Sequence, residues 1–236
     1  MRLPETRVLA ALIFDFDHTR TDFGRGVDWQ TARDQIVALY EGTGVDTAAV
    51  MRGHGSLSLI AALDAAVTAR HSPERAFVTR VEASRILERV EVAGAHRASL
   101  LPGAAVVIAE AARAGLALAI VSANAESAIR AALDRLGVLG SFTVVVGRDP
   151  SRPLKPEPDM HHEALRVLGC APAAALGIGD STNDVRAALA AGMLAVGVAG
   201  GESQPEDLLA AGAAFVLADL TAAPALLALW RAAADE

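Results

Sequence analysis

The sequence predicts an α/β protein, in which a doubly wound parallel sheet carries a small inserted all-α domain. Two observations lead to this fold class. From about Leu101 to the C-terminus, short continuous apolar runs alternate with helical stretches, which indicates repeated βαβ units. Before that point, a stretch of about 75 residues shows helical spacing without a strand run, which is long enough for a small domain.

The first expected element is a buried strand. Val8 to Phe14 form a continuous apolar run without alternation, which is typical of a strand covered on both faces. The run changes abruptly to acidic residues at Asp15. Similar runs predict further strands at Leu116–Val121, Phe142–Val146, Leu176–Ile178, Ala195–Val198 and Phe215–Leu217.

The inserted region follows the first strand. Leu59, Leu63 and Val67 lie one helical turn apart, and Pro73 to Val92 has the pattern of one long helix. We therefore expect residues 1–21 and 98–236 to form the α/β core, with residues 22–97 as a helical lid inserted into it.

Helices are expected between the strands of the core. Glu126 to Leu136 places apolar residues at helical spacing, and Gly137 ends the pattern. Met160–Leu168 and Asp184–Ala191 have the same character. The alternation of these helices with the strands completes the expected doubly wound core.

The composition indicates a globular protein that binds neither nucleic acid nor membranes. Hydrophobic residues make up 53% of the chain, and the net charge of −7 includes no basic stripe. The longest late apolar stretch, Ala104–Ala123, is broken by Glu110 and Arg113, so we expect a helix and a strand there. The single cysteine, Cys170, suits a reducing compartment. We expect a cytoplasmic protein whose partner is a small metabolite; its oligomeric state is not readable from the sequence.

Polar clusters occur where the predicted strands end. In open α/β sheets, ligands bind outside the carboxyl ends of the strands. Because these ends lie on one edge of the sheet, we expect the clusters to converge. They are Asp15 and Asp17 after the first strand, Ser122-Ala123-Asn124 after the second, Lys155 after the third, and Asp180 with Asp184 after the fourth.

Four of these residues are acids. Asp15 and Asp17 are two positions apart on a strand and face the same way, with Asp180 and Asp184 expected nearby. Carboxylates so close together repel one another unless a cation offsets them. An oxygen-only donor set suits a hard cation, and a few carboxylates together with phosphate oxygens suit Mg²⁺.

Two further residues indicate a phosphate site. Lys155 is the only lysine among 21 basic residues, which suggests that a compact ammonium group is needed there. Ser122 and the backbone N–H groups that follow it precede an expected helix, and a helix N-terminus binds phosphate oxygens. The sequence therefore predicts phosphate chemistry at the acidic edge.

Together these clusters resemble, in order and spacing, the four motifs of the haloacid dehalogenase superfamily. The stretch that begins at Asp15, DFDHT, is similar to its aspartate-x-aspartate signature, and GDSTND is similar to its acidic motif. Ser122 and Lys155 match its hydroxyl and lysine motifs. The resemblance covers the whole core and implies a Rossmann-like sheet. The position of the insertion is similar to that of the helical-cap group, which includes phosphoglycolate phosphatase-like enzymes.

The resemblance implies a phosphatase mechanism. Asp15 would attack phosphorus and become an aspartyl-phosphate. Asp17 would protonate the leaving alkoxide and then deprotonate the water that cleaves the intermediate. Asp17 would have to be protonated in the first step while Asp15 is ionised, so their pKa values should differ.

The resemblance also implies the ligands of the cofactor and of the substrate. Mg²⁺ would be held by the Asp15 carboxylate, the Asp17 backbone carbonyl and Asp180, with Asp184 supporting. The phosphate would be bound by Ser122, Ala123, Asn124 and Lys155.

Several residues carry less information. His18 and Arg20 depart from the commonest family pattern, in which glycine and leucine stand there. Arg25 near the hinge and His54 in a glycine-rich stretch of the lid could contact substrate, or could belong to solvated surface. For His161 and His162, on the helix after Lys155, we expect surface positions.

Each motif has a structural explanation when it is taken alone. An Asp pair can cap a turn, Ser122 can cap a helix, and Lys155 can be an ordinary surface residue. Asp180 and Asp184 can be acids favoured by the helix dipole. Their joint occurrence, in order and at strand ends, favours catalysis.

Other functions of the same fold are weighed as alternatives. A dehalogenase needs no general acid, so Asp17 argues against it. Phosphonate cleavage through a lid lysine is excluded because the lid contains no lysine. A phosphosugar mutase would keep all four motifs, and a non-catalytic phosphate-binding module would keep the fold.

Overall fold

The computed structural model describes residues 9–17, 19, 21–50 and 56–223. Their centre is a six-stranded parallel sheet in the order β3-β2-β1-β4-β5-β6. The first strand, β1, lies in the middle of the sheet; β2 and β3 extend it to one edge, and β4, β5 and β6 form the other half. The doubly wound parallel sheet expected from the sequence is confirmed.

The strands are short and mostly buried, as their apolar sequences predict. Their bounds are β1 Ala11–Phe14, β2 Ala117–Val121, β3 Val144–Val146, β4 Ala175–Gly179, β5 Leu194–Val198 and β6 Phe215–Leu217. Each predicted run therefore contains or overlaps a strand.

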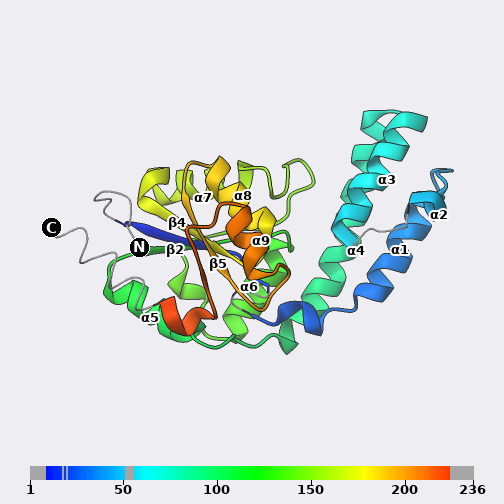
Figure 1. The fold of residues 1–236 in the computed structure, drawn as a ribbon. Helices are drawn as coiled ribbons and strands as arrows, with labels where there is room; N and C mark the ends of the chain where they lie inside the picture. The colour runs from blue at the N-terminus through cyan, green and yellow to red at the C-terminus, as the bar shows by residue number, and fades with distance from the viewer. Residues whose placement is uncertain (1–8, 18, 20, 51–55, 224–236) are drawn as a thin grey trace.

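Helices cover both faces of the sheet (Figure 1). Leu12 and Phe14 of β1 face one apolar core, formed with α5 Ala104–Arg113 and α6 Glu126–Arg135. The alternate β1 residues face a second core on the other side. Its helices are α7 Asp159–Leu168, α8 Thr182–Ala190 and α9 Pro205–Ala210.

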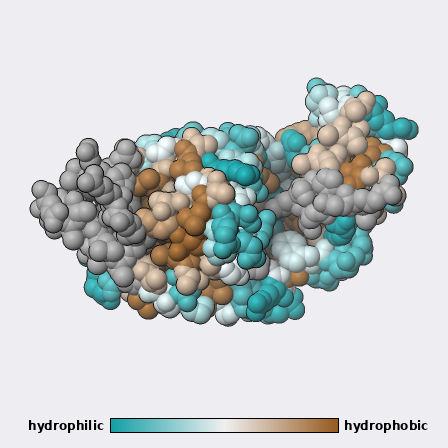
Figure 2. Space-filling model, in the orientation of Figure 1, coloured by the Kyte–Doolittle hydropathy of each residue, from teal (hydrophilic) through white to brown (hydrophobic). Residues whose placement is uncertain are grey.

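A helical region lies between β1 and α5 and projects from one end of the α/β body (Figure 1). It contains α1 Trp29–Glu41, α2 Thr47–Val50, α3 Ser56–Arg70 and α4 Pro73–Gly94, which we call the cap helices. The short 3-10 helices η1 Phe23–Gly26 and η2 Ala95–Arg97 connect it to the body. In the space-filling view the outline is notched between body and cap helices (Figure 2).

The cap helices have an apolar core of their own. Its buried members include Leu63 and Val67, two of the residues that predicted a helix there, together with Ile36 and Leu87 from neighbouring helices. At the base of the region, Thr21 forms an isolated bridge with Leu100, so the entering and leaving chains run side by side. The separate core supports the inserted-domain interpretation, whose exact boundaries stay a prediction.

One expectation about α7 is wrong. His162 is exposed as expected, but His161 is buried at 4% exposure and packs with Met160, Ala164 and Leu165 on one face of the helix. Residues at positions i, i+3 and i+4 of a helix share one side, and this side of α7 contacts strands β2 and β3 of the sheet. The polarity of the His161 side chain suggests the surface, but its place in the helical period puts it on the buried face of α7.

Among the described residues, every helix is too short or too polar to cross a lipid bilayer.

Candidate active site

A cleft of about 1060 Å³ lies where the carboxyl ends of the central strands meet the cap helices. All four polar clusters contribute to its lining, through residues 15 and 17, 122–124, 155, and 180–184 except Thr182. The cap helices contribute Trp29, Ile60, Ala61, Asp64, Arg80 and Ser84. The cleft therefore has a charged floor from the core and a mixed polar and apolar roof.

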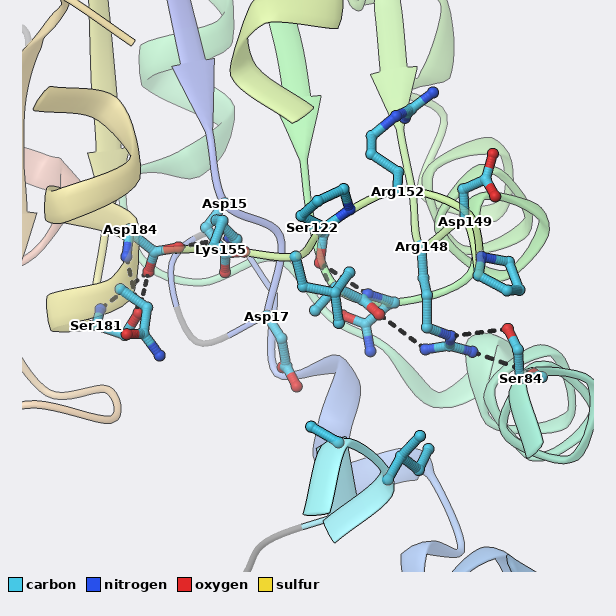
Figure 3. A pocket seen from close by; sticks show the side chains of 18 of the residues that line it. Asp15, Asp17, Ser84, Ser122, Arg148, Asp149, Arg152, Lys155, Ser181 and Asp184 are labelled. Carbon is cyan, nitrogen blue, oxygen red and sulfur yellow. Dashed lines mark hydrogen bonds and ion pairs between the residues drawn. The ribbon is translucent and has the colours of Figure 1, made fainter. Parts of the chain in front are cut away.

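Lys155 is the centre of the charged floor (Figure 3). Its Nζ lies 2.6 Å from Asp15 Oδ1 and 2.5 Å from Asp184 Oδ1, and it donates to the Val121 carbonyl at 3.1 Å. The side chain is 8% exposed. Lys155 thus joins residues from the ends of β1 and β2 to the start of α8.

Three carboxylates lie together at this floor, and Lys155 contacts two of them, Asp15 and Asp184. Asp15, Asp180 and Asp184 each offer an oxygen within 4.8 Å of the others. Asp180 accepts from Thr19 Oγ1 and from the Glu202 backbone N–H, both at 2.7 Å. When all three acids are ionised, the group keeps a net negative charge even after Lys155 is counted.

Asp184 is held most firmly of the three. It forms a capping box with Ser181 at the start of α8, accepting from the Ser181 N–H at 3.0 Å and from its hydroxyl at 2.7 Å. Burial opposes ionisation of Asp184, but Lys155 and the Ser181 hydrogen bonds outweigh it and lower the pKa of this carboxyl. Asp184 is therefore a fixed anion.

The pKa of Asp15 is shifted in the opposite direction from that of Asp184. Burial raises the pKa of its carboxyl well above the ordinary value, Lys155 opposes this rise, and Asp184 and Asp180 add to it. Its Oδ2 receives no hydrogen bond from the described residues and borders the cleft. Ionised Asp15 therefore needs more positive charge than Lys155 supplies.

The donor set fits a hard divalent cation. The three-acid group offers only oxygen atoms, has excess negative charge, and opens into a cleft wide enough for an ion with water ligands. Asp184 has both oxygens engaged by protein donors, which suits a supporting position instead of direct ligation.

Asp17 lies beside this group but outside it, nearer the cap helices (Figure 3). Its Oδ1 accepts from the Gly24 backbone N–H at 2.9 Å, in η1 at the base of the cap region. A Cβ at Gly24 would lie 2.4 Å from Asp17 Oδ2, so only glycine allows this approach. The Asp17 carbonyl accepts from Thr19 N at 2.6 Å.

Ser122 begins a tight turn that leads into α6. Its hydroxyl donates to Asn124 Oδ1 at 2.9 Å and accepts from the Asn124 N–H at 3.3 Å. The turn, residues 122–125, places its backbone N–H groups at the N-terminus of α6, where anions are stabilised. We call residues 122–125 the phosphate turn.

A second polar cluster lies within the cap helices. Asp64 accepts from the Tyr40 hydroxyl and, at 3.0 Å, from Arg80 Nη1. Arg80 Nε also donates to the Pro150 carbonyl of the core at 3.0 Å. Burial raises the pKa of both Tyr40 and Asp64.

The structure brings together all the core residues named from the sequence. Asp15, Asp17, Asp180, Asp184, Lys155 and Ser122-Ala123-Asn124 all line the one cleft. Arg25, by contrast, is exposed on η1 and is not part of the lining. His54 lies outside the described residues, as do His18 and Arg20.

Sequence reasoning missed Arg148, which lines the cleft and contacts Ser84 of α4 (Figure 3). It follows β3 by two residues, so the rule that selected the other strand ends could have found it. Arg80 and Glu91 of α4 were also missed. Their signal is weak, because α4 carries many charged residues and the sequence does not show which of them face the core.

Comparison with known proteins places these features in a family context. The sequence profile of haloacid dehalogenase-like hydrolases matches residues 9–192. Phosphoglycolate phosphatase of Rhodospirillum rubrum is 31% identical over 89% of this chain and 87% of its own. Phosphoglycolate phosphatase of Rhodobacter capsulatus is 30% identical over 93% of this chain and 97% of its own.

Solved structures give the same fold. CbbY from Rhodobacter sphaeroides in complex with phosphate superposes with a TM-score of 0.60 at 25% identity, covering 91% of this chain and 96% of its own. A hydrolase from Pseudomonas syringae gives a TM-score of 0.67 at 23% identity, over 93% and 98% of the two chains.

Proposed function

This chain belongs to the haloacid dehalogenase-like hydrolase family, and we propose that it is a Mg²⁺-dependent phosphatase that cleaves a small phosphate monoester through an aspartyl-phosphate on Asp15. The observation that carries the proposal is the contact of Lys155 with both Asp15 and Asp184 at the floor of the cleft. It joins a nucleophile, a fixed anion and a fixed cation at one point.

Asp15 is the nucleophile in this proposal. Its Oδ2, which the described residues leave without a hydrogen bond, forms a bond to phosphorus while the ester P–O bond breaks. Attack requires the ionised carboxylate, and the ammonium of Lys155 favours this form. Lys155 also neutralises charge on the phosphoryl oxygens.

Asp17 is the general acid and base. It gives its proton to the leaving alkoxide in the first step, and takes a proton from the water that attacks the aspartyl-phosphate in the second. The products are an alcohol, inorganic phosphate and regenerated Asp15. The Gly24 N–H fixes the orientation of Asp17, which supports its role beside the transferring group.

The phosphate turn and a cation complete the site. Ser122 and the N–H groups of Ala123 and Asn124 bind the non-bridging oxygens. Mg²⁺ would be held by the Asp15 carboxylate, the Asp17 carbonyl and Asp180, with Asp184 supporting, and when bound it neutralises the phosphate charge. The oxygen-only acids of the floor support this assignment.

Residues 22–97 act as the cap in this proposal. The cap helices form the roof of the cleft, which limits the substrate to a small ester. Phosphoglycolate is the first candidate, because two relatives of at least 30% identity are named phosphoglycolate phosphatases. His54 is a proposed substrate contact of the cap, whereas Arg25 lies outside the cleft lining.

The test is phosphate release from phosphoglycolate, sugar phosphates and an aryl phosphate, with Mg²⁺ and with EDTA, by wild type and Asp17→Asn. An aryl leaving group departs without a proton, whereas an alkyl one needs it. Asp17→Asn should therefore lower the rate of alkyl ester hydrolysis by roughly 10²–10⁴-fold. The same variant should slow the first step of aryl ester cleavage much less. The burst of aryl alcohol reports that first step.

The outcomes separate the competing functions. Release that requires Mg²⁺ supports the phosphatase. Isomerisation of a sugar phosphate that needs a bisphosphate activator would identify a mutase instead. Binding of phosphate without turnover of any ester would leave a non-catalytic module.

A further inference from the structure

A buried ion pair connects the cap helices to the core. Glu91 of α4 and Arg148, which follows β3, form two parallel hydrogen bonds, Arg148 Nη1 to Glu91 Oε1 and Arg148 Nη2 to Glu91 Oε2, both at 2.9 Å. The Arg148 and Glu91 side chains are 5% and 1% exposed. The pair is outside the set of residues given a catalytic role above.

The same two side chains also hold the phosphate turn. Glu91 accepts from the Ala125 N–H at 2.9 Å and from Asn124 Nδ2 at 3.3 Å. Arg148 Nη1 donates to the Ala123 carbonyl at 2.7 Å, and its backbone N–H donates to the Asn124 carbonyl at 2.8 Å. Three consecutive residues of the turn are therefore fixed by this pair.

The connection ends on the hydroxyl that is proposed to bind phosphate. Asn124 Oδ1, on the amide group that Glu91 holds, accepts the Ser122 hydroxyl at 2.9 Å. Asn124 thus fixes the position of the Ser122 hydroxyl oxygen through both of these groups, its side-chain amide and its backbone N–H. Glu91 acts on Ser122 through one intermediate side chain.

The charges of Glu91 and Arg148 explain why both residues are needed to hold a turn that binds phosphate. A lone carboxylate at the N-terminus of α6 would satisfy its N–H groups but would repel a phosphate bound at the same turn. Arg148 neutralises Glu91 by donating to both of its carboxylate oxygens, including the oxygen that accepts the Ala125 N–H. The turn is then held by a carboxylate while the net charge beside the phosphate stays near zero.

We propose that Glu91 and Arg148 are positioning residues for the phosphate subsite, so that helix α4 of the cap sets the shape of the phosphate turn. The inference rests on the proposed function only for the identity of the turn's ligand. Arg148 is further tied to α4 through Ser84, with Nε 3.1 Å from its hydroxyl, so the guanidinium has no freedom to follow a substrate.

The experiment compares Glu91→Gln with the matched variant Glu88→Gln. Glu88 lies one helical turn before Glu91 on α4 and accepts from the Ser127 hydroxyl of α6 at 2.5 Å. It therefore also connects α4 to α6, but it is exposed and does not contact the phosphate turn. The readouts are kcat, KM, the inhibition constant of inorganic phosphate and the thermal midpoint, each with Mg²⁺ present.

Glu91→Gln should raise KM and the phosphate inhibition constant at least tenfold, because hydrogen bonds to a charged group are lost from the turn. Glu88→Gln should change both by less than about twofold. Equal kinetic effects in the two variants, or a Glu91→Gln variant with a lowered thermal midpoint and unchanged constants, would overturn the proposal.

A double variant, Glu91→Met with Arg148→Met, separates positioning from folding. Replacing both partners of a buried pair by apolar side chains of similar volume leaves no unpaired charge, so this variant should recover much of the thermal midpoint. Its KM and phosphate inhibition constant should stay raised. Recovery of the wild-type constants would show that the pair only stabilises the fold.

Calorimetric binding of inorganic phosphate makes the test independent of turnover. If wild type cleaves no ester but binds phosphate at least tenfold more tightly than Glu91→Gln does, the proposed function fails and the positioning role stands. If the two proteins bind phosphate equally, or wild type does not bind it at all, the positioning role fails.

Discussion

Two groups of charged residues in the molecule, one at the floor of the cleft and one within the cap helices, differ in how their charge is balanced. At the floor of the cleft, Asp15, Asp180 and Asp184 lie together beside one ammonium group, that of Lys155, which contacts Asp15 and Asp184. In the cap, Asp64 meets one guanidinium and one neutral hydroxyl and is already balanced. Both clusters are largely buried and hydrogen-bonded, so burial alone does not distinguish a reactive site from a structural one.

The imbalance at the floor indicates function. A folded protein gains nothing from placing three carboxylates beside one cation unless something else arrives to offset them. The cap cluster, in contrast, can stabilise its helices without a ligand.

Asp15→Asn should abolish turnover, with a loss on the order of 10⁴-fold or more in kcat, because the amide cannot attack phosphorus. The variant should not lose stability in EDTA, because it removes one of three repelling carboxylates and its amide oxygen can still accept from Lys155. Steady-state kinetics measures the loss in kcat, and urea unfolding measures the stability. A strongly destabilised variant would contradict the conclusion that the three carboxylates of the floor carry excess negative charge.

Lys155→Met should lower the free energy of unfolding in EDTA by about 3–5 kcal/mol, because Asp15 and Asp184 are left buried and uncompensated. Arg80→Met, the matched change in the cap, should cost only about 1 kcal/mol, because Arg80 is 39% exposed and solvent screens the pair. Urea unfolding of both variants gives the comparison. Equal losses would remove the distinction between the clusters.

Mg²⁺ should stabilise wild type at pH 7 by about 2.7 kcal/mol at a hundred times its dissociation constant. The pKa of Asp15 is raised above its ordinary 3.8, so its ionised form disfavours the folded state at neutral pH until a cation offsets it. As pH falls through this raised pKa, Asp15 binds a proton instead, and the stabilisation should shrink. Thermal unfolding from pH 7 to pH 4, with Mg²⁺ or EDTA, measures this.

Asp180→Asn is the control for the cation. It removes one acid of the group while Asp15 and its contact with Lys155 remain, and the stabilisation by Mg²⁺ should disappear. An undiminished effect of Mg²⁺ in this variant would place the ion elsewhere.

Tyr40→Phe should cost about 2 kcal/mol of stability through the lost hydrogen bond to Asp64, and should leave kcat/KM within about twofold. Burial raises the pKa of Asp64, and the tyrosine opposes that rise. The cost should therefore be largest at neutral pH and decrease as pH falls and Asp64 becomes protonated. A large loss of activity would mean that the cap cluster belongs to the active site.

The sequence was most informative where local pattern and chain topology act together. The apolar runs at Val8–Phe14 and Leu176–Ile178 predicted central parallel strands, and the rule about strand ends then brought Asp15 and Asp180 together. Residues positioned by packing between distant segments were harder to predict. Glu91 is one of several acids on α4, and only the docking of α4 beside α6 reveals that it meets Ala125 and Arg148.

His161 shows a different limit. Polarity suggested the surface, but its position in the helical period placed it beneath the sheet, where burial lowers its pKa to about 3 and keeps it neutral. In contrast, the pairing of Asp17 with Gly24 could not be read from either residue, since it depends on how η1 folds back over the strand end.

The Glu91–Arg148 pair has a consequence for engineering the protein by recombination. A designer who exchanges residues 22–97 for the corresponding segment of a relative would remove Glu91 and leave Arg148 behind, because position 148 lies about fifty residues beyond the splice point. A chimera made in this way inherits an unmatched charge beneath its own phosphate turn. The transferable unit is therefore the helical insert together with position 148, and libraries that vary the two jointly should yield more active chimeras than libraries built from the insert alone.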